Sequence, residues 1–113
     1  MGLIEAKEKV KEIVSADLID VQGEINSKGN YIHLSGTTRV STLKTAFIFS
    51  LTIVGHSLTG SEDSIENILS EVLKNIFLYE LEEQADLNVS SKIVKIEDLL
   101  AYEIKLTIED KTR

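Results

Sequence analysis

The strongest constraint on the fold is the stretch from Leu43 to Val54, in which side chains alternate between two faces as in a β-strand. One face carries Phe47, Phe49, Leu51 and Ile53. The other face is mixed and carries Ala46, Ile48, Ser50, Thr52 and Val54. We expect the phenylalanine face to lie in the core, and Gly55 to end the strand.

An amphipathic helix is predicted after the loop Gly55–Gly60. Ser61 is a suitable N-cap, and Glu62 and Asp63 fall in the first turn, where the helix dipole favours acids. The apolar residues then recur at helical spacing: Ile65, Ile68, Leu69, Val72, Leu73, Ile76 and Phe77. We expect this helix to run to about Tyr79 and to pack its apolar stripe on the phenylalanine face.

The remaining elements are shorter. Apolar residues at helical spacing predict a first helix over Leu3–Val14. Strands are expected at Leu18–Val21, at Tyr31–Leu34 closed by Ser35-Gly36, at Ser91–Ile96 and at Tyr102–Ile108. The order α-β-β-β-α-β-β indicates an α+β fold, with a single antiparallel or mixed sheet and two helices packed on one face. The length of 113 residues fits one domain over residues 1–113.

Composition argues against several classes of protein. The chain has no Cys, which excludes disulfides and thiolate chemistry. Its longest strongly apolar stretch, Ala46–Val54, is shorter than the roughly 20 residues that a membrane helix needs. Met1–Glu5 lacks the basic and apolar regions of a signal peptide. The net charge of −7 argues against direct nucleic-acid binding, which requires a basic surface.

The chain contains no pattern typical of a catalytic, metal or nucleotide site. His33 and His56 are isolated, whereas a metal site needs three or four converging ligands. The loop before the second helix has two glycines at the Walker gap, but Ser61 stands where the lysine is required. The acids between Glu80 and Asp86 lack the spacing of a calcium loop. We therefore expect no enzyme activity, no metal and no cofactor.

The charges are distributed unevenly along the chain. No Asp or Glu occurs between Ile25 and Ser61, whereas the acids between Glu62 and Asp86 are accompanied by a single base, Lys74. One interpretation is that these are two solvated faces. The other is that the two regions meet between subunits. The residues expected at that interface are Lys28, Arg39, Lys44, Glu80, Glu82 and Glu83.

One region resembles a known family. The strand from Phe47 ends in the V-G-x-S-L turn Val54–Leu58, and the helix Glu62–Phe77 follows. This pattern is similar to that of the small tail proteins of Mu-like prophages, which are of tail-terminator type. The order of elements agrees over nearly the whole chain, and the residue-level match covers about Phe47 to Phe77. Two features depart from the family: the turn His56–Ser61 lacks its basic residues, and Glu80–Ser90 has no counterpart.

The resemblance implies a structural function in a phage particle or in the host cytoplasm during assembly. A tail terminator caps the tail tube as a ring, usually of six subunits, and presents a surface to the neck. Such a ring needs two different faces that meet head to tail, and it needs no active site, membrane or sequence-specific nucleic-acid contact. Two alternatives stay open: a cellular α+β protein-binding or dimeric regulatory module without catalysis, and a small enzyme.

Overall fold

A computed structural model describes residues 2–15, 18–21, 23, 25, 27–42, 44–55, 65–96 and 99–111. The elements are α1 (Leu3–Val14), β1 (Ile19–Asp20), β2 (Gly29–Ser41), β3 (Lys44–Gly55), α2 (Ile65–Glu83), β4 (Ser90–Ile96) and β5 (Leu99–Lys111). This order confirms the predicted α-β-β-β-α-β-β arrangement and the α+β class. The predicted N-cap Ser61, the first-turn acids Glu62 and Asp63, and His56 lie outside the described residues.

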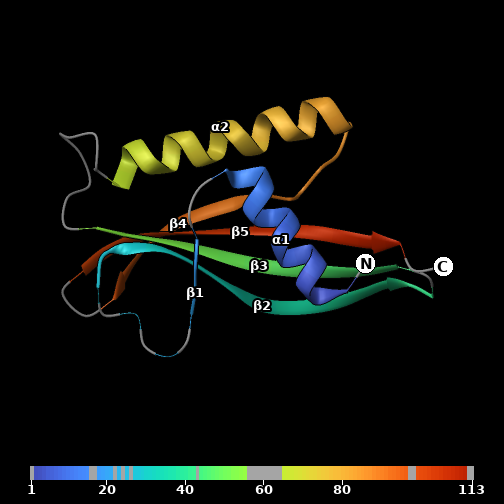
Figure 1. Cartoon of the computed structure of the whole chain (residues 1–113), viewed down its shortest axis with the longest axis horizontal. Helices are drawn as coiled ribbons and strands as arrows, with labels where there is room; N and C mark the ends of the chain where they lie inside the picture. Colours follow the sequence, from blue (N-terminus) through green and yellow to red (C-terminus); the bar gives the residue numbers. More distant parts are fainter. Residues whose placement is uncertain are drawn as a thin grey trace.

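The strands form one mixed sheet in the order β1-β2-β3-β5-β4 (Figure 1). The short β1 runs parallel to β2, and the other neighbouring pairs are antiparallel. β2 and β3 are consecutive in the chain and form a long hairpin at the centre of the sheet. β5 pairs with β3 over its whole length, whereas β4 pairs only with the first half of β5.

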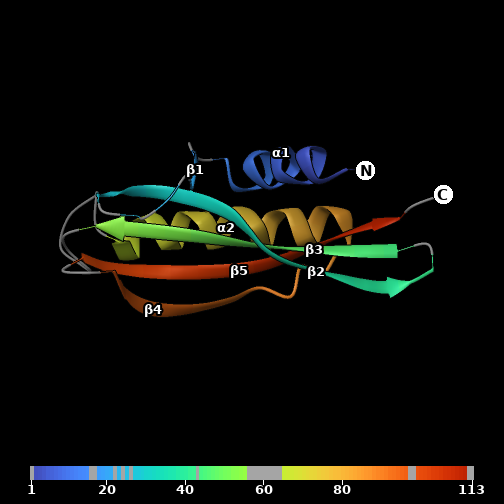
Figure 2. The ribbon, with the colours of Figure 1, turned by 90° about the horizontal axis from the view of Figure 1, so that it is seen from below.

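The core lies between the phenylalanine face of the sheet and the two helices. Phe49 of β3 lies between Leu34 and Leu106 on the neighbouring strands, and Leu51 lies between Ile32 and Ile104. The helix residues in the same buried cluster include Val10, Val14, Val72 and Ile76. Each fully buried side chain of this kind stabilises the fold by about 1.5–3 kcal/mol. Figure 2 shows α1 next to the β1–β2 side of the sheet, with β4 at the other side.

Three elements extend well beyond their predicted bounds: β2, α2 and β5, which runs over Leu99–Lys111 instead of Tyr102–Ile108. Ser35-Gly36 does not close the second strand, because a register shift between Leu34 and Gly36 absorbs one extra residue and β2 continues to Ser41. The Ser35 hydroxyl donates a hydrogen bond to the Ile48 carbonyl at 3.0 Å and fixes this bulge on the neighbouring strand.

The second helix also continues past Tyr79, to Glu83. Gln84 then adopts a left-handed conformation with φ of 52°, and the Ala85 amide donates to the Glu80 carbonyl at 3.0 Å. These are the features of a Schellman C-terminal cap. The predicted apolar stripe is only partly buried. Val72 and Ile76 are in the core, whereas Phe77, which also belongs to the apolar stripe, is 56% exposed.

Candidate functional site

The three basic residues predicted at a subunit interface do not form one patch. Arg39 and Lys44 lie at the hairpin turn between β2 and β3, whereas Lys28 precedes the opposite end of β2. At about 3.3 Å per residue, Lys28 and Arg39 are about 36 Å apart along the strand. The hairpin turn and the C-terminal end of α2 lie at the same end of the long axis (Figure 1). The structure thus places Arg39 and Lys44, but not Lys28, at the same end of the molecule as the acids of α2.

The two bases at the hairpin turn differ in their contacts. The Arg39 guanidinium donates to the carbonyls of Ser41 and Thr42 at 3.3 and 3.5 Å, which holds the turn. Lys44 instead pairs with the carboxylate of Glu109 on β5, with a distance of 2.7 Å between Nζ and Oε2. Carbonyls orient the Arg39 side chain without neutralising its charge, whereas Glu109 offsets the charge of Lys44. Arg39 is therefore the stronger candidate for an external acidic partner.

The three acids of α2 also divide into two kinds. The Glu80 carboxylate accepts a hydrogen bond from the Leu87 amide at 3.0 Å and orders the turn after the helix. Glu82 and Glu83 are exposed in the last turn, which contains no basic residue. Carboxylates at this position face the negative end of the helix dipole, which typically costs about 0.3–1 kcal/mol. A positive group from outside the chain would relieve this repulsion at Glu82 and Glu83.

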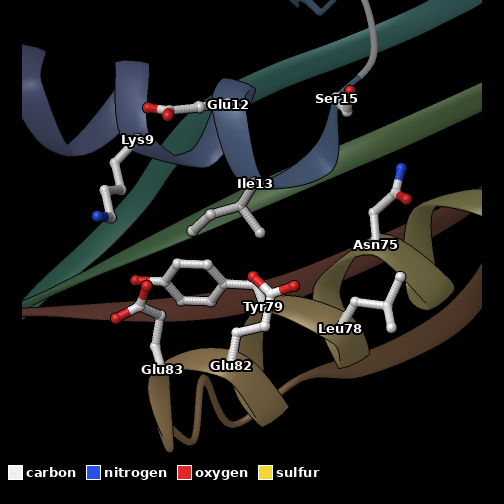
Figure 3. A pocket seen from close by; sticks show the side chains of 9 residues that line it. All are labelled: Lys9, Glu12, Ile13, Ser15, Asn75, Leu78, Tyr79, Glu82 and Glu83. Atoms are coloured by element: carbon white, nitrogen blue, oxygen red, sulfur yellow. The ribbon is translucent and has the colours of Figure 1, made fainter.

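A groove of about 320 Å³ lies between α1 and α2 and is lined by side chains from both helices (Figure 3). The Lys9 ammonium lies 5.5 Å from the centre of the Tyr79 ring, within the range of a cation–π contact. At the end of the groove the Asn75 amide donates to the Val14 carbonyl at 2.7 Å. The polar groups of this groove therefore join the two helices. Glu82 and Glu83 line its outer side, so two of the predicted interface residues are accessible from it.

The face of the sheet that is turned away from the core carries no helix among the described residues. Its centre is polar: Ser50 and Thr52 of β3 are buried between neighbouring side chains, and His33 lies opposite Ser50. Ser50 Oγ and His33 Nδ1 have no hydrogen-bond partner within the described part of the chain. Both atoms are already buried in the free chain, where a buried polar atom without a partner typically costs about 1–3 kcal/mol.

Sequence reasoning missed a set of apolar side chains that are more than half exposed. They are Ile4 of α1, Ile19 of β1, Val40 of β2, Phe77 and Leu81 of α2, and Ile93 of β4. Single exposed apolar residues are common, and the informative feature is where these lie relative to one another. The sequence did contain one signal of this exposure. On the second helix the apolar residues continue to Leu81, so they occupy more of the helix surface than a single stripe.

The described residues contain no group of His, Asp or Glu side chains arranged to hold a metal ion. No helix in the described ranges has the length and apolar character needed to cross a membrane. Among known proteins, no family model and no curated protein sequence matches this chain. The geometry of the chain itself therefore carries the functional argument.

Proposed function

We propose that the chain is a structural tail-completion protein of tail-terminator type. In this proposal copies of the chain assemble head to tail into a ring that caps a tail tube and joins it to the neck. A head-to-tail ring requires two different, complementary sides on each subunit. The resemblance of Phe47–Phe77 to prophage tail proteins supplies the biological context, and the two unlike sides of the fold support the mode of assembly.

The observation that carries the proposal is the placement of Arg39 relative to Glu82 and Glu83. Arg39 lies at the hairpin end of β2, beyond the residues that pair with β1, whereas both acids belong to α2, which runs over β3 and β5 (Figure 2). Both groups lie at the same end of the long axis (Figure 1). Rotating one copy about an axis parallel to the strands brings its Arg39 towards the acids of its neighbour.

These charges set the orientation of neighbouring copies more than the strength of their contact. An exposed ion pair contributes about 0–1 kcal/mol, and salt screens it. Lys44 and Glu80 have partners in their own chain and have a smaller share in the contact. Lys28 lies at the far end of β2, so a charge change at Lys28 is the control for the same change at Arg39.

A charge swap tests the proposal. In cells that carry the gene and produce particles, deletion of the gene should give tails of unregulated length that lack heads, as seen by electron microscopy. The wild-type chain should restore normal particles, and Arg39→Glu should not. Combining Arg39→Glu with Glu82→Lys and Glu83→Lys should restore them in part. Lys28→Glu makes the same charge change at the other end of β2 and should complement normally.

Three results would count against the proposal. Neighbouring genes that encode no tail tube, sheath or portal protein would remove its biological context. A stable dimer that forms no larger assembly on tail tubes would instead support the protein-binding or regulatory alternative. Normal complementation by Arg39→Glu would place the subunit contact elsewhere.

A further inference from the structure

The sheet ends, at the turn between β2 and β3, in a three-stranded arm with two free edges. We define the arm as residues 36–41 of β2, 44–48 of β3 and 107–111 of β5, which pair with one another. β4 pairs with β5 only up to Lys105, and β1 pairs with β2 only at Tyr31 and Ile32. The arm extends past both helices along the long axis (Figure 1). β2 therefore forms one edge of the arm, and β5 forms the other.

The β5 edge of the arm carries unpaired main-chain groups. The Thr107 amide points away from β3 and donates to the Leu87 carbonyl at 2.8 Å. In an antiparallel strand the main-chain groups of every second residue point to the same side. Glu109 and Lys111 therefore also point their amides and carbonyls outwards, where no described residue bonds to them. An unpaired edge of this kind accepts a further strand.

The β2 edge of the arm is unpaired as well. The last bond on this side is the one in which the Ile32 carbonyl accepts from the Val21 amide at 3.1 Å. From Ile32 onwards, every second position of the ladder with β3 points outwards, and past the bulge these positions are Thr37 and Arg39. Within the described part of the chain, their main-chain groups have no partner on that side.

The two free edges lie at the same height along the strands. Thr38 of β2 and Glu109 of β5 are both in register with Ala46 of β3, which lies between them. β2 and β5 run in the same direction, because each is antiparallel to β3. Rotating a second copy about an axis parallel to the strands, without translation, would bring its Thr38 opposite Glu109. The two strands would then form a parallel pair.

This register fits the hydrogen-bond pattern of a parallel pair. In such a pair, an outward-pointing residue bonds to the residues on either side of the one that it faces. Glu109 would face Thr38, so its amide would donate to the Thr37 carbonyl and its carbonyl would accept from the Arg39 amide. Thr38 and Glu109 also share one face of the sheet, as opposed residues must. A shift of one residue would break both conditions.

The charges at the two edges are complementary in the same register. Arg39 would come opposite position 110, which is an aspartate. A groove of about 520 Å³ lies between this edge of β5 and the turn after α2, and exposed Asp86 lines it. The Arg39 guanidinium bonds only to carbonyls in its own chain, so these acids would offset a charge that is otherwise not neutralised. Opposite charges on facing strands contribute about 0.2–1 kcal/mol.

The arm is turned relative to the rest of the sheet, which separates its free edges from β1 and β4. Figure 2 shows that β2 and β5 exchange sides of β3 between the two ends of the sheet. The bulge between Leu34 and Gly36 lies at the height of Leu106, next to the point where β4 begins. A bulge bends its strand and increases the local twist. β4 therefore does not occupy the side from which a neighbour would approach the arm.

We infer that β2 of one copy pairs with β5 of the next through the arm, in parallel and with Thr38 opposite Glu109, so that the sheets of neighbouring copies join. This inference rests on the proposed function and deepens it, because it names the main-chain contact that aligns Arg39 with the acids of the neighbour. Equal heights matter because a closed ring needs rotation without translation, whereas an offset would produce an open helical filament.

Disulfide cross-linking tests the inference directly, because the natural chain has no cysteine to give background. The full chain carrying both Thr38→Cys and Glu109→Cys, under mild oxidation, should give a series of covalent multimers. Within one chain β3 separates the two positions by about 9–10 Å, which is beyond the roughly 7 Å that a disulfide spans between Cα atoms. A mixture of the two single variants should stop at dimers. Each single variant alone should stay monomeric, because a head-to-tail contact does not bring identical residues together.

The matched control combines Thr38→Cys with Glu103→Cys in place of Glu109→Cys. Like Glu109, Glu103 is a glutamate of β5 that pairs with a lysine, but it lies about 20 Å further along the strand, where β4 covers the edge. The control should give at least tenfold less product, with folding of each variant checked by circular dichroism. The pair Ser41→Cys and Lys111→Cys lies in the same register and tests the contact if Glu109→Cys does not fold.

Efficient dimer formation by either single variant would overturn the inference in favour of a two-fold contact. Equal yields from the Glu103→Cys control, or no product from either pair at high protein concentration, would also overturn it. The result separates this contact from the proposed function. Covalent multimers of a chain that does not complete tails would retain the contact and reject the tail-completion role. Normal particles from a chain that does not cross-link at these positions would retain the role and reject the contact.

Discussion

Replacing Phe49 by alanine should cause one of the largest losses of stability in this chain. Its ring is fully buried at the centre of the sheet, between Leu34 and Leu106 on the neighbouring strands. Because these neighbours are held in β-ladders, the cavity left by the ring cannot collapse readily. Truncation of a buried phenylalanine costs about 3–5 kcal/mol. At about 4 °C per kcal/mol for a domain of this size, the melting temperature should fall by about 12–20 °C.

The matched control for this substitution is Phe77→Ala, which removes the same ring from a site that is 56% exposed. Its cost in the free chain should be about 1 kcal/mol or less, because most of the ring already contacts solvent. Urea unfolding followed by circular dichroism measures both free energies. Equal losses in the two variants would refute the assignment of the core to the phenylalanine face and of Phe77 to the surface.

Two smaller effects follow from the polar contacts. Asn75→Ala should cost about 1–2 kcal/mol in urea unfolding, because it leaves the Val14 carbonyl at the end of α1 without this partner; an unchanged midpoint would show that the helices are joined by apolar packing alone. Lys44→Gln should cost no more than about 1 kcal/mol, since its pair with Glu109 is partly exposed, and the difference from wild type should shrink in high salt. A salt-independent loss would contradict an electrostatic origin.

The sequence predicted the element order because the strongest signals are local. Strict alternation over Phe47–Ile53 and the helical spacing of Leu3–Val14 each reflect burial of one face of one element. The extent of β2 depends on a partner strand instead. Ser35-Gly36 is a turn signal in isolation, but hydrogen bonding to β3 on both sides of a bulge carries the strand through it. No periodicity within β2 itself contains that information.

The expected interface residues show a similar limit. Lys28, Arg39 and Lys44 are close in sequence and share an acid-free segment. A long strand separates its two ends by its own length, so nearness along the chain does not imply a common patch. The partner of Lys44 could not be foreseen either, because Glu109 comes from the last strand and reaches it only through the pairing of β3 with β5.

The apolar residues of α2 show why helical spacing alone does not determine which side chains are buried. A sheet covers only the part of a helix surface that faces it, and α1 covers a second part of α2. Val72 and Ile76 lie within this covered surface, whereas Phe77 and Leu81 lie beyond it. A helix that only had to complete this domain would gain solubility from polar residues at both positions. In the free chain both side chains are left to solvent, at 56% and 59% exposure, because neither the sheet nor α1 covers that part of the helix surface.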